Sequence, residues 1–521
     1  MFTAPAMISG LLSRAIAGRG SRPIARRSLL AAVLLAVAAL AAALPGLLSG
    51  GADDGDSEAL PTASLPVSVL VDTRHPGPQV RGRFLGLSFE AAALTQIARL
   101  GDRGNLVTLL RSLGPGVLRF GGVSADTQVA WTDRSTPRPA WARRAIGPAD
   151  LSALARLASA SGWKVLLTVG LAHYEPLPAA REVAAARRAL GSRLAGIEVG
   201  NEPDAYGGHA IRPLPWTYAQ YSAEVSRYRR AIARTAHGVR LAGPGVSGSK
   251  IFAAWGRGEA SSQRPALLTG HHYPLGCHQL PPPSIERLLS LQTRELEGRS
   301  LDRFMSVSSS SSIRFRMDEL GSVSCGGAAG ISNAFASALW ATGYVAQAMA
   351  KGVAGVNFQG NPANCFGYAP LCAPTAGRLQ AGLLDAQPGW YALLLTRKLI
   401  GARPLPTKLI SAGQPNMIVR AFRAGDGALR VVVVNDEPPG APAAALRMRL
   451  GRRYPRAAVL SLTAPSPAAT SGVRLGGRVV ARDGTWREPS QTPVIASHRG
   501  ALSLTVAPSS AVLLTMPQAH T

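Results

Sequence analysis

The strongest constraint on the fold is a series of eight short apolar runs between residues 83 and 360, most of which end at glycine or proline. They are Arg83–Glu90, Gly116–Gly122, Lys164–Gly170, Ala195–Pro203, Val239–Gly245, Leu267–Pro274, Ile313–Gly321 and Gly352–Gly360. Helically spaced Ala, Leu and Arg residues separate them, as in Asp150–Ser161, Trp216–Thr235 and Asn333–Lys351. Eight strands alternating with helices predict a (β/α)8 TIM barrel. A doubly wound sheet is the alternative, but the chain has no glycine-rich phosphate loop.

The sequence changes character after Gly401, where short β-rich runs are separated by Pro, Gly and Asp turns. These runs are Asn416–Arg423, Ala428–Asn435, Ala445–Leu450, Ala457–Thr463, Val473–Ala481 and Leu502–Met516. They predict a C-terminal β-sandwich of about eight strands, which Leu65–Asp72 could join. The expected organisation is therefore a leader in residues 1–50, a linker in 51–66, the barrel in 67–400 and the sandwich in 401–521.

The N-terminal segment has the charge order of an export signal or membrane anchor. An uncharged run, Ser28–Ala52, lies between four acids that follow it and five arginines that precede it, Arg14, Arg19, Arg22, Arg26 and Arg27. Pro45 and Gly46 shorten the helix expected there to Leu29–Leu44. That is less than the roughly 20 residues of a comfortable span, which favours a cleaved signal peptide over an anchor. We therefore expect an extracytoplasmic protein, secreted or anchored by this segment.

The formal net charge of +27 comes almost entirely from arginine. Because the arginines are dispersed, compositional bias explains the charge better than a nucleic-acid site does, and no base-reading motif is present. We expect no nucleic-acid partner and no membrane contact beyond the N-terminal segment. The sequence leaves the oligomeric state open.

Four cysteines in an exported chain make disulfides plausible, with three ways to pair them. Cys365 and Cys372 would close a short loop, and Cys277 and Cys325 would lie on neighbouring loops of the barrel. None has the spacing of a zinc site, so we expect no metal and no cofactor.

Polar residues collect at the carboxyl ends of the predicted strands, where TIM barrels carry their functional groups. In chain order these are Glu90, Gly121-Gly122, Asn201-Glu202, His271-His272-Tyr273, Glu319, and Asn357 with Gln359. A single strand-terminal glutamate is commonly a cap or an ion-pair partner. Two of them, ending the fourth and seventh strands, favour two-carboxylate hydrolysis of a glycosidic bond.

Four segments carry a family resemblance. Leu118–Gly122 (LRFGG), Val199–Pro203 (VGNEP), Gly270–Tyr273 (GHHY) and Asp318–Gly327 (DELGSVSCGG) resemble glycoside hydrolase family 79, the heparanase and β-glucuronidase family of the retaining clan A. The likeness runs from about Val67 to the C-terminus. It implies that Glu202 is the acid/base and Glu319 the nucleophile. We expect the Glu319 anion to raise the pKa of Glu202, and the two carboxyl groups to lie about 5–5.5 Å apart.

The same resemblance implies the sugar contacts. Asn201 would bind the 2-hydroxyl, Tyr273 would hydrogen-bond Glu319, and Glu90 would bind distal hydroxyls. The backbone of the segment after the nucleophile, at Ser324, Cys325 and Gly326, would bind a uronate carboxylate. Heparanase-like members carry a tyrosine before the paired glycines where this chain has Ser324-Cys325, so this partner of the carboxylate is either missing here or supplied by Tyr368 from the eighth loop.

Other polar and aromatic residues near these strand ends are expected to be structural. His272 is expected behind the site, and Glu198 as a buried structural acid. Alternation along the strand places Asp318 on the side opposite Glu319, paired with Arg314 or Arg316. Three tryptophans could stack on sugar faces or belong to the core: Trp131, Trp141 and Trp216.

The expected activity is that of a retaining β-glycosidase resembling a β-glucuronidase. One alternative is a β-glycosidase of neutral sugars, such as a xylosidase or glucosidase. Another is a non-catalytic basic surface protein that binds polysaccharide.

Overall fold

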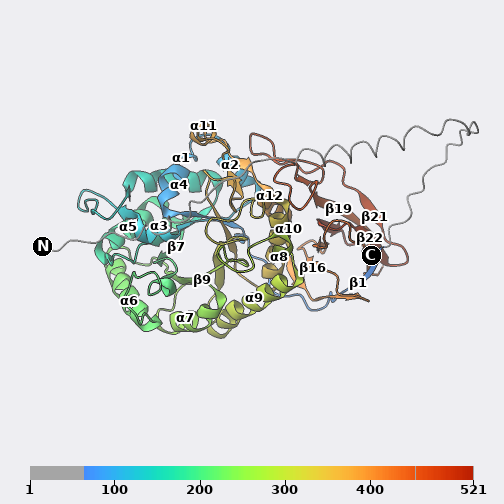
Figure 1. Cartoon of the computed structure of the whole chain (residues 1–521), viewed down its shortest axis with the longest axis horizontal. Helices are drawn as coiled ribbons and strands as arrows, with labels where there is room; N and C mark the ends of the chain where they lie inside the picture. Colours follow the sequence, from blue (N-terminus) through green and yellow to red (C-terminus); the bar gives the residue numbers. More distant parts are fainter. Residues whose placement is uncertain (1–63, 452, 520–521) are drawn as a thin grey trace, which may run out of the picture. The chain divides into compact units, whose positions relative to one another are not determined.

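The computed structural model describes residues 64–451 and 453–519, so the expected leader lies outside the described residues. All eight expected barrel strands form and pair in parallel, surrounded by helices (Figure 1). In chain order they are β2 (Gly86–Glu90), β3 (Val117–Gly121), β6 (Lys164–Val169), β7 (Leu194–Val199), β8 (Ala242–Val246), β9 (Leu267–His272), β10 (Phe315–Leu320) and β11 (Val356–Gly360).

The sheet closes into a barrel between β7 and β8. Ile197 forms a parallel bridge with Leu241, and its N–H donates to the carbonyl of Arg240 at 2.9 Å. The predicted fold class is confirmed. Because the strands run in parallel, their carboxyl ends meet at one face of the barrel.

Local sequence signals mark the ends of some of the helices of the described residues. α4 begins where the Asp150 carboxylate accepts the Gly147 N–H at 2.9 Å, and it ends at Gly162, whose φ of 78° suits glycine. The helices are α1 (Leu94–Arg99), α2 (Leu106–Ser112), α3 (Val123–Thr127), α4 (Pro148–Ser161), α5 (Pro176–Leu190), α6 (Tyr218–Thr235), α7 (Ser249–Ser262), α8 (Ile285–Leu288), α9 (Leu291–Ser311), α10 (Phe335–Ala350), α11 (Ala376–Ala381) and α12 (Pro388–Thr396).

Within the described part of the chain, no helix combines the length and apolarity needed to cross a bilayer.

The C-terminal strands form two larger sheets. One contains β14 (Arg403–Leu405), β16 (Met417–Arg423), β17 (Leu429–Asn435), β23 (Ser510–Met516), β19 (Arg456–Thr463), β20 (Arg474–Leu475) and β21 (Val494–Ala496). The other contains β15 (Thr407–Ser411), β1 (Leu65–Val71), β18 (Ala444–Arg449) and β22 (Ala501–Val506). The strand expected before the barrel, β1, thus belongs to the sandwich, where it pairs with β15 and β18.

Two expected sandwich strands differ from the structure. Leu502–Met516 is split into β22 and β23, which lie in different sheets. Val473–Ala481 keeps only the two residues of β20, because Gly476 and Gly477 turn the chain at φ values of 59° and 73°.

The larger C-terminal sheet is buried on both faces. Along β17, Val432 and Val434 pack in the barrel's hydrophobic cluster, while Val431 and Val433 pack in the sandwich interior. On α10, Gly343 allows close approach, because a Cβ there would lie 2.4 Å from Ile418 Cδ1 of β16. The described residues from Ser64 onwards accordingly belong to one compact unit. The boundary expected at residue 400, where the secondary structure changes, stays a prediction.

Candidate active site

The carboxyl-terminal face of the barrel is organised around Arg119, a fully buried guanidinium on β3. Its Nη1 donates to Glu319 Oε2 at 2.6 Å and its Nη2 to Asn201 Oδ1 at 2.8 Å. Its Nε lies 3.1 Å from Glu198 Oε2 and 3.0 Å from Asp318 Oδ2. One cation therefore compensates three buried carboxyl groups. A charged residue inside an apolar strand was the available sequence signal for this role.

The expectation that Asp318 faces away from Glu319 is wrong. The register of β10 shifts after Met317 against both neighbouring strands, between Met317 and Glu319 in the pairing with β9 and between Met317 and Leu320 in the pairing with β11. This bulge interrupts the alternation, so both carboxylates reach Arg119. Asp318 is ion-paired as expected, but with Arg119. Arg316 instead donates to Asn357 Oδ1 at 2.6 Å.

Arg119 should be essential for stability, because its removal leaves several buried acids without a counter-charge. We expect Arg119→Met to lower the free energy of unfolding by about 3–5 kcal/mol, measured by urea denaturation. The matched control is Arg156→Met, which removes only an exposed pair with Asp102 and should change stability little. Equal losses in the two variants would contradict this account.

Glu202 follows β7 in a strained turn. Its φ is 45°, and its N–H donates to the carbonyl of Gly245 at 3.0 Å. Its Oε1 lies 2.8 Å from Nδ1 of His271, a fully buried imidazole at the end of β9. An oxygen of Glu202, an oxygen of Glu319 and a ring nitrogen of His271 all lie within 4.8 Å of one another. The fourth and seventh strands thus bring their glutamates together, as predicted.

Burial alone would raise the pKa of Glu202, but the hydrogen bond and charge of His271, with Arg119, lower it below its ordinary value. The expectation of a raised pKa is therefore wrong. Burial acts to lower the pKa of His271, yet Glu319 and Asp318 raise it well above its ordinary value. These opposite shifts favour a proton on the imidazole over a proton on the carboxyl group. Sequence reasoning placed His271 at a strand end but assigned it no role, because adjacent histidines alternate sides and only the tertiary structure shows which one faces Glu202.

Tyr273 and His272 lie where expected. The phenol of Tyr273 donates to Glu319 Oε1 at 2.8 Å, and burial raises the pKa of Tyr273, which keeps the donor protonated. His272 points away from the pocket, with Nε2 3.2 Å from Glu297 Oε1 and its ring stacked on Tyr344. Glu319 thus receives hydrogen bonds on both oxygens, from Tyr273 and from Arg119.

Glu90 is held at the pocket edge by helix α3. Its Oε2 accepts the N–H of Ser124 at 2.9 Å and the Ser124 hydroxyl at 2.5 Å. Burial raises the pKa of Glu90. The paired glycines of LRFGG are explained here, because a Cβ on Gly122 would lie 2.2 Å from Glu90 Oε1, at a φ of 70°.

Asp126 is a further buried acid that sequence reasoning missed. Its Oδ2 accepts the N–H of Asn201 at 2.9 Å and the Tyr206 hydroxyl at 2.6 Å, and its Oδ1 accepts the N–H of Leu171 at 2.8 Å. Asp126 therefore fixes the loop that carries Asn201 and Glu202. Its partners are 45 to 80 residues away in sequence, so no local pattern reports it.

The site opens into a cavity of about 630 Å³. Its walls include every expected sugar-contacting residue, namely Glu90, Asn201, Glu202, Tyr273, Glu319, Ser324, Cys325, Gly326 and Tyr368. The three candidate tryptophans lie elsewhere: Trp131 is buried, Trp141 stacks on His173, and Trp216 donates to the carbonyl of Pro203.

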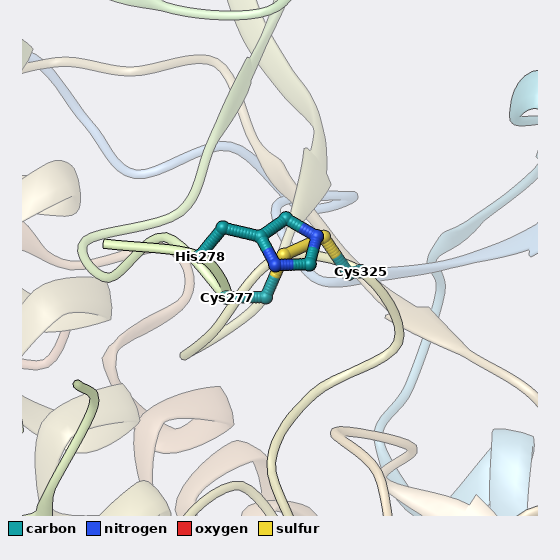
Figure 2. Close-up of side chains that lie close together, drawn as sticks. All are labelled: Cys277, His278 and Cys325. Carbon is teal, nitrogen blue, oxygen red and sulfur yellow. A yellow bond between two sulfur atoms is a disulfide. The ribbon is translucent and has the colours of Figure 1, made fainter. Parts of the chain in front are cut away.

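Disulfides hold two loops of the pocket wall. Cys277 is bonded to Cys325, and Cys365 to Cys372. Figure 2 shows the imidazole of His278 beside the Cys277–Cys325 disulfide; with both sulfurs bonded, this trio offers no thiolate to a metal. Cys325, Gly326 and Gly327 all have positive φ, from 58° to 95°, which turns this segment along the cavity.

The trio of Glu202, His271 and Glu319 has the composition of a metal site, but its charges suit proton transfer better. Arg119 already places a positive charge 2.6 Å from Glu319, and a cation there would be repelled.

Solved structures similar to this fold are glycoside hydrolases. A 4-O-α-L-rhamnosyl-β-D-glucuronidase from Fusarium oxysporum 12S matches with a TM-score of 0.69 and 18% identity, covering 86% of this chain and 100% of that chain. A GH51 arabinofuranosidase from Xanthomonas axonopodis pv. citri matches at 0.63 and 15%, covering 87% and 100%. The catalytic domain of GH30 xylanase C from Talaromyces cellulolyticus matches at 0.53 and 12%, covering 86% and 99%.

At these identities the likeness concerns the fold. No protein-family model and no curated protein sequence matches the chain.

Proposed function

We propose that this chain is a retaining β-glycoside hydrolase with Glu319 as nucleophile and Glu202 as acid/base. The observation that carries the proposal is the approach of the two glutamates, whose oxygens lie within 4.8 Å. Retaining enzymes hold their carboxyl groups about 5–5.5 Å apart, and inverting enzymes about 6.5–9.5 Å. The close approach of the two glutamates therefore favours the retaining spacing over the wider inverting one, in which a water attacks from beneath the sugar.

In the proposed first step, Glu319 attacks the anomeric carbon and the bond to the leaving oxygen breaks. Arg119 and Tyr273 each donate a hydrogen bond to one oxygen of Glu319 and hold its side chain at the cavity. Glu202 protonates the leaving oxygen. A bound sugar excludes water and disfavours the Glu202 anion, so the proton crosses the 2.8 Å hydrogen bond from His271 to Glu202.

In the second step, Glu202 accepts a proton from water, which attacks the glycosyl–Glu319 ester and releases the sugar with retained configuration. Asn201 is positioned to bind the 2-hydroxyl, since Arg119 orients its side chain and Asp126 its backbone.

The pH profile of kcat/KM should test the role of His271. In the proposed mechanism His271 stores the acidic proton, and its pKa is raised well above the ordinary value, so the alkaline limb reports loss of that shared proton. In His271→Gln only the Glu202 carboxyl can hold the proton, with a pKa raised by burial alone, and the alkaline limb should move to lower pH. His272→Gln, the matched control, contacts Glu297 instead and should leave the limb in place. An unmoved limb in His271→Gln would contradict the assignment.

For the sugar, we propose a β-glucuronide. Ser324, Cys325, Gly326 and Tyr368 line the cavity; the N–H of Ser324 already donates to the carbonyl of Leu275 at 3.0 Å, so the N–H groups of Cys325 and Gly326 and the phenol of Tyr368 would receive a uronate carboxylate. A β-glycosidase of neutral sugars is the second candidate. It is favoured by one observation, that no lysine or arginine lines the cavity within the described residues.

A panel of 4-methylumbelliferyl glycosides tests the proposal: the β-glucuronide, β-xyloside, β-glucoside and α-L-arabinofuranoside. Glucuronide turnover above the others supports the uronate assignment, and xyloside or glucoside turnover at least as fast replaces it with the neutral-sugar enzyme. If no glycoside is cleaved, while polysaccharide binding persists, the non-catalytic alternative stands.

We also propose that the protein works outside the cytoplasm. Support comes from the charge order of residues 1–58 and from two disulfides, which persist in oxidising compartments. Cell fractionation tests this, and recovery of the chain only from a reducing cytoplasm would contradict it.

A further inference from the structure

A second cavity, of about 490 Å³, is lined by five arginines and no acidic residue. The arginines are Arg99, Arg103, Arg138, Arg143 and Arg144, and all five are exposed. Within residues 64–451 and 453–519, their side chains form no ion pair and no hydrogen bond, in contrast to many other arginines of this chain. We call this cavity the arginine groove.

The groove is built by segments that the barrel places side by side. Arg138, Arg143 and Arg144 come from the excursion between β3 and α4, where β4 (Val129–Trp131) and β5 (Arg144–Ile146) pair in parallel. Arg99 ends α1, and Arg103 follows it. Apolar side chains complete the lining, from Val129, Ile146 and Leu379.

Compositional bias explains why the chain has many arginines, but it does not explain why these five have no acidic side chain as a partner. Nearby arginines do have partners: Arg156 pairs with Asp102, next to Arg103, and Arg378 pairs with Asp385 on the segment after α11. Five guanidinium groups around one concavity repel one another, and a low-dielectric wall strengthens their combined field. Such a groove attracts a ligand with several anionic groups, and guanidinium forks suit carboxylate and sulfate.

The groove adjoins the candidate active site. Glu90 lines the catalytic cavity, and the next two residues, Ala91 and Ala92, line the groove. One turn of chain therefore faces both cavities. A polymer held in the groove would present neighbouring units to the catalytic cavity.

We propose that the arginine groove is a second binding site, separate from the catalytic cavity, that holds the anionic groups of an acidic polysaccharide. The inference that the groove binds anions depends only on the residues of the groove. The choice of a polysaccharide rests on the proposed function, because a glycosidase acts on glycans.

Binding is measured on the full chain carrying Glu319→Gln, so that no probe is consumed. The probes are heparin, oligo(dT) as nucleic acid and neutral dextran, at several salt concentrations. The groove variant is Arg138→Gln/Arg143→Gln/Arg144→Gln. The matched control removes three charges from exposed sandwich arginines, Arg447→Gln/Arg449→Gln/Arg456→Gln.

We expect heparin to bind in a salt-dependent manner, dextran not to bind, and the groove variant to bind heparin roughly tenfold or more weakly than the control variant. Lysine at the same three positions keeps the charge and should restore most of the affinity, which separates charge loss from misfolding. If the groove variant and the control variant lose heparin affinity equally, the groove proposal is wrong. Oligo(dT) binding as tightly as heparin would overturn the polysaccharide assignment.

The result of the heparin-binding experiment does not depend on the result of the glycoside panel. If the panel shows no hydrolysis but the groove variant alone loses heparin, the proposed enzymatic function fails and the anion site remains. If hydrolysis is found and heparin binding is unchanged in the groove variant, the groove proposal fails by itself.

Discussion

Replacing Glu319 with glutamine should lower kcat by roughly 10⁴-fold or more on whichever aryl glycoside proves to be the substrate. The amide cannot form the glycosyl ester, whereas its size keeps the side chain among Tyr273 and Arg119. A 2-fluoro glycoside of the same sugar should inactivate the unmodified protein. Mass spectrometry of its peptides should then find the adduct on Glu319.

The control for this variant is Glu295→Gln, which changes an exposed glutamate of α9 that pairs loosely with Arg299. It should keep full activity. Retention of more than a few per cent of activity in Glu319→Gln, or an adduct on another residue, would refute the nucleophile assignment.

Replacing Glu202 with alanine should have the second-largest effect, and its size should depend on the leaving group. General acid catalysis contributes about 10²–10⁴-fold, so a substrate with a poor leaving group, such as an alkyl glycoside, should lose about that much in kcat/KM. A dinitrophenyl glycoside needs little protonation and should lose much less in the first step. Azide, placed in the space left by the side chain, should accelerate turnover and give the β-glycosyl azide.

The control for this variant is Glu198→Gln, because Glu198 lies close to the same site but contacts Arg119 and Thr168 instead of lining the cavity. It should not show this dependence on the leaving group, and azide should not affect it. If kcat/KM of Glu202→Ala falls equally for substrates with poor and good leaving groups, and no glycosyl azide forms, another group is the acid.

Much of the barrel could be predicted because its signals are local. A strand such as Lys164–Val169 is a continuous apolar run between turn residues, and parallel strands buried on both faces need nothing more. The sandwich was predicted less well where turns determine where a strand ends and which sheet the next strand joins. The run Leu502–Met516 reads as one strand, yet Ala507–Ser509 redirect it into a second sheet.

The electrostatic environment of the site could not be read in the same way. The bulge in β10 depends on how that strand pairs with β9 and β11, so alternation misplaced Asp318. The pKa of Glu202 depends on His271, 69 residues away, and sequence reasoning considered only Glu319.

The sequence by itself determined that strand-terminal glutamates 202 and 319 would meet, because parallel strands of a closed barrel must end at one face. Only the tertiary structure decided which charges surround them, since Arg119, Asp126 and His271 act through contacts between distant strands. It also decided that five arginines share one groove without an acid. Hydrophobic periodicity is written along the chain, whereas an electrostatic field is a sum over distances in space.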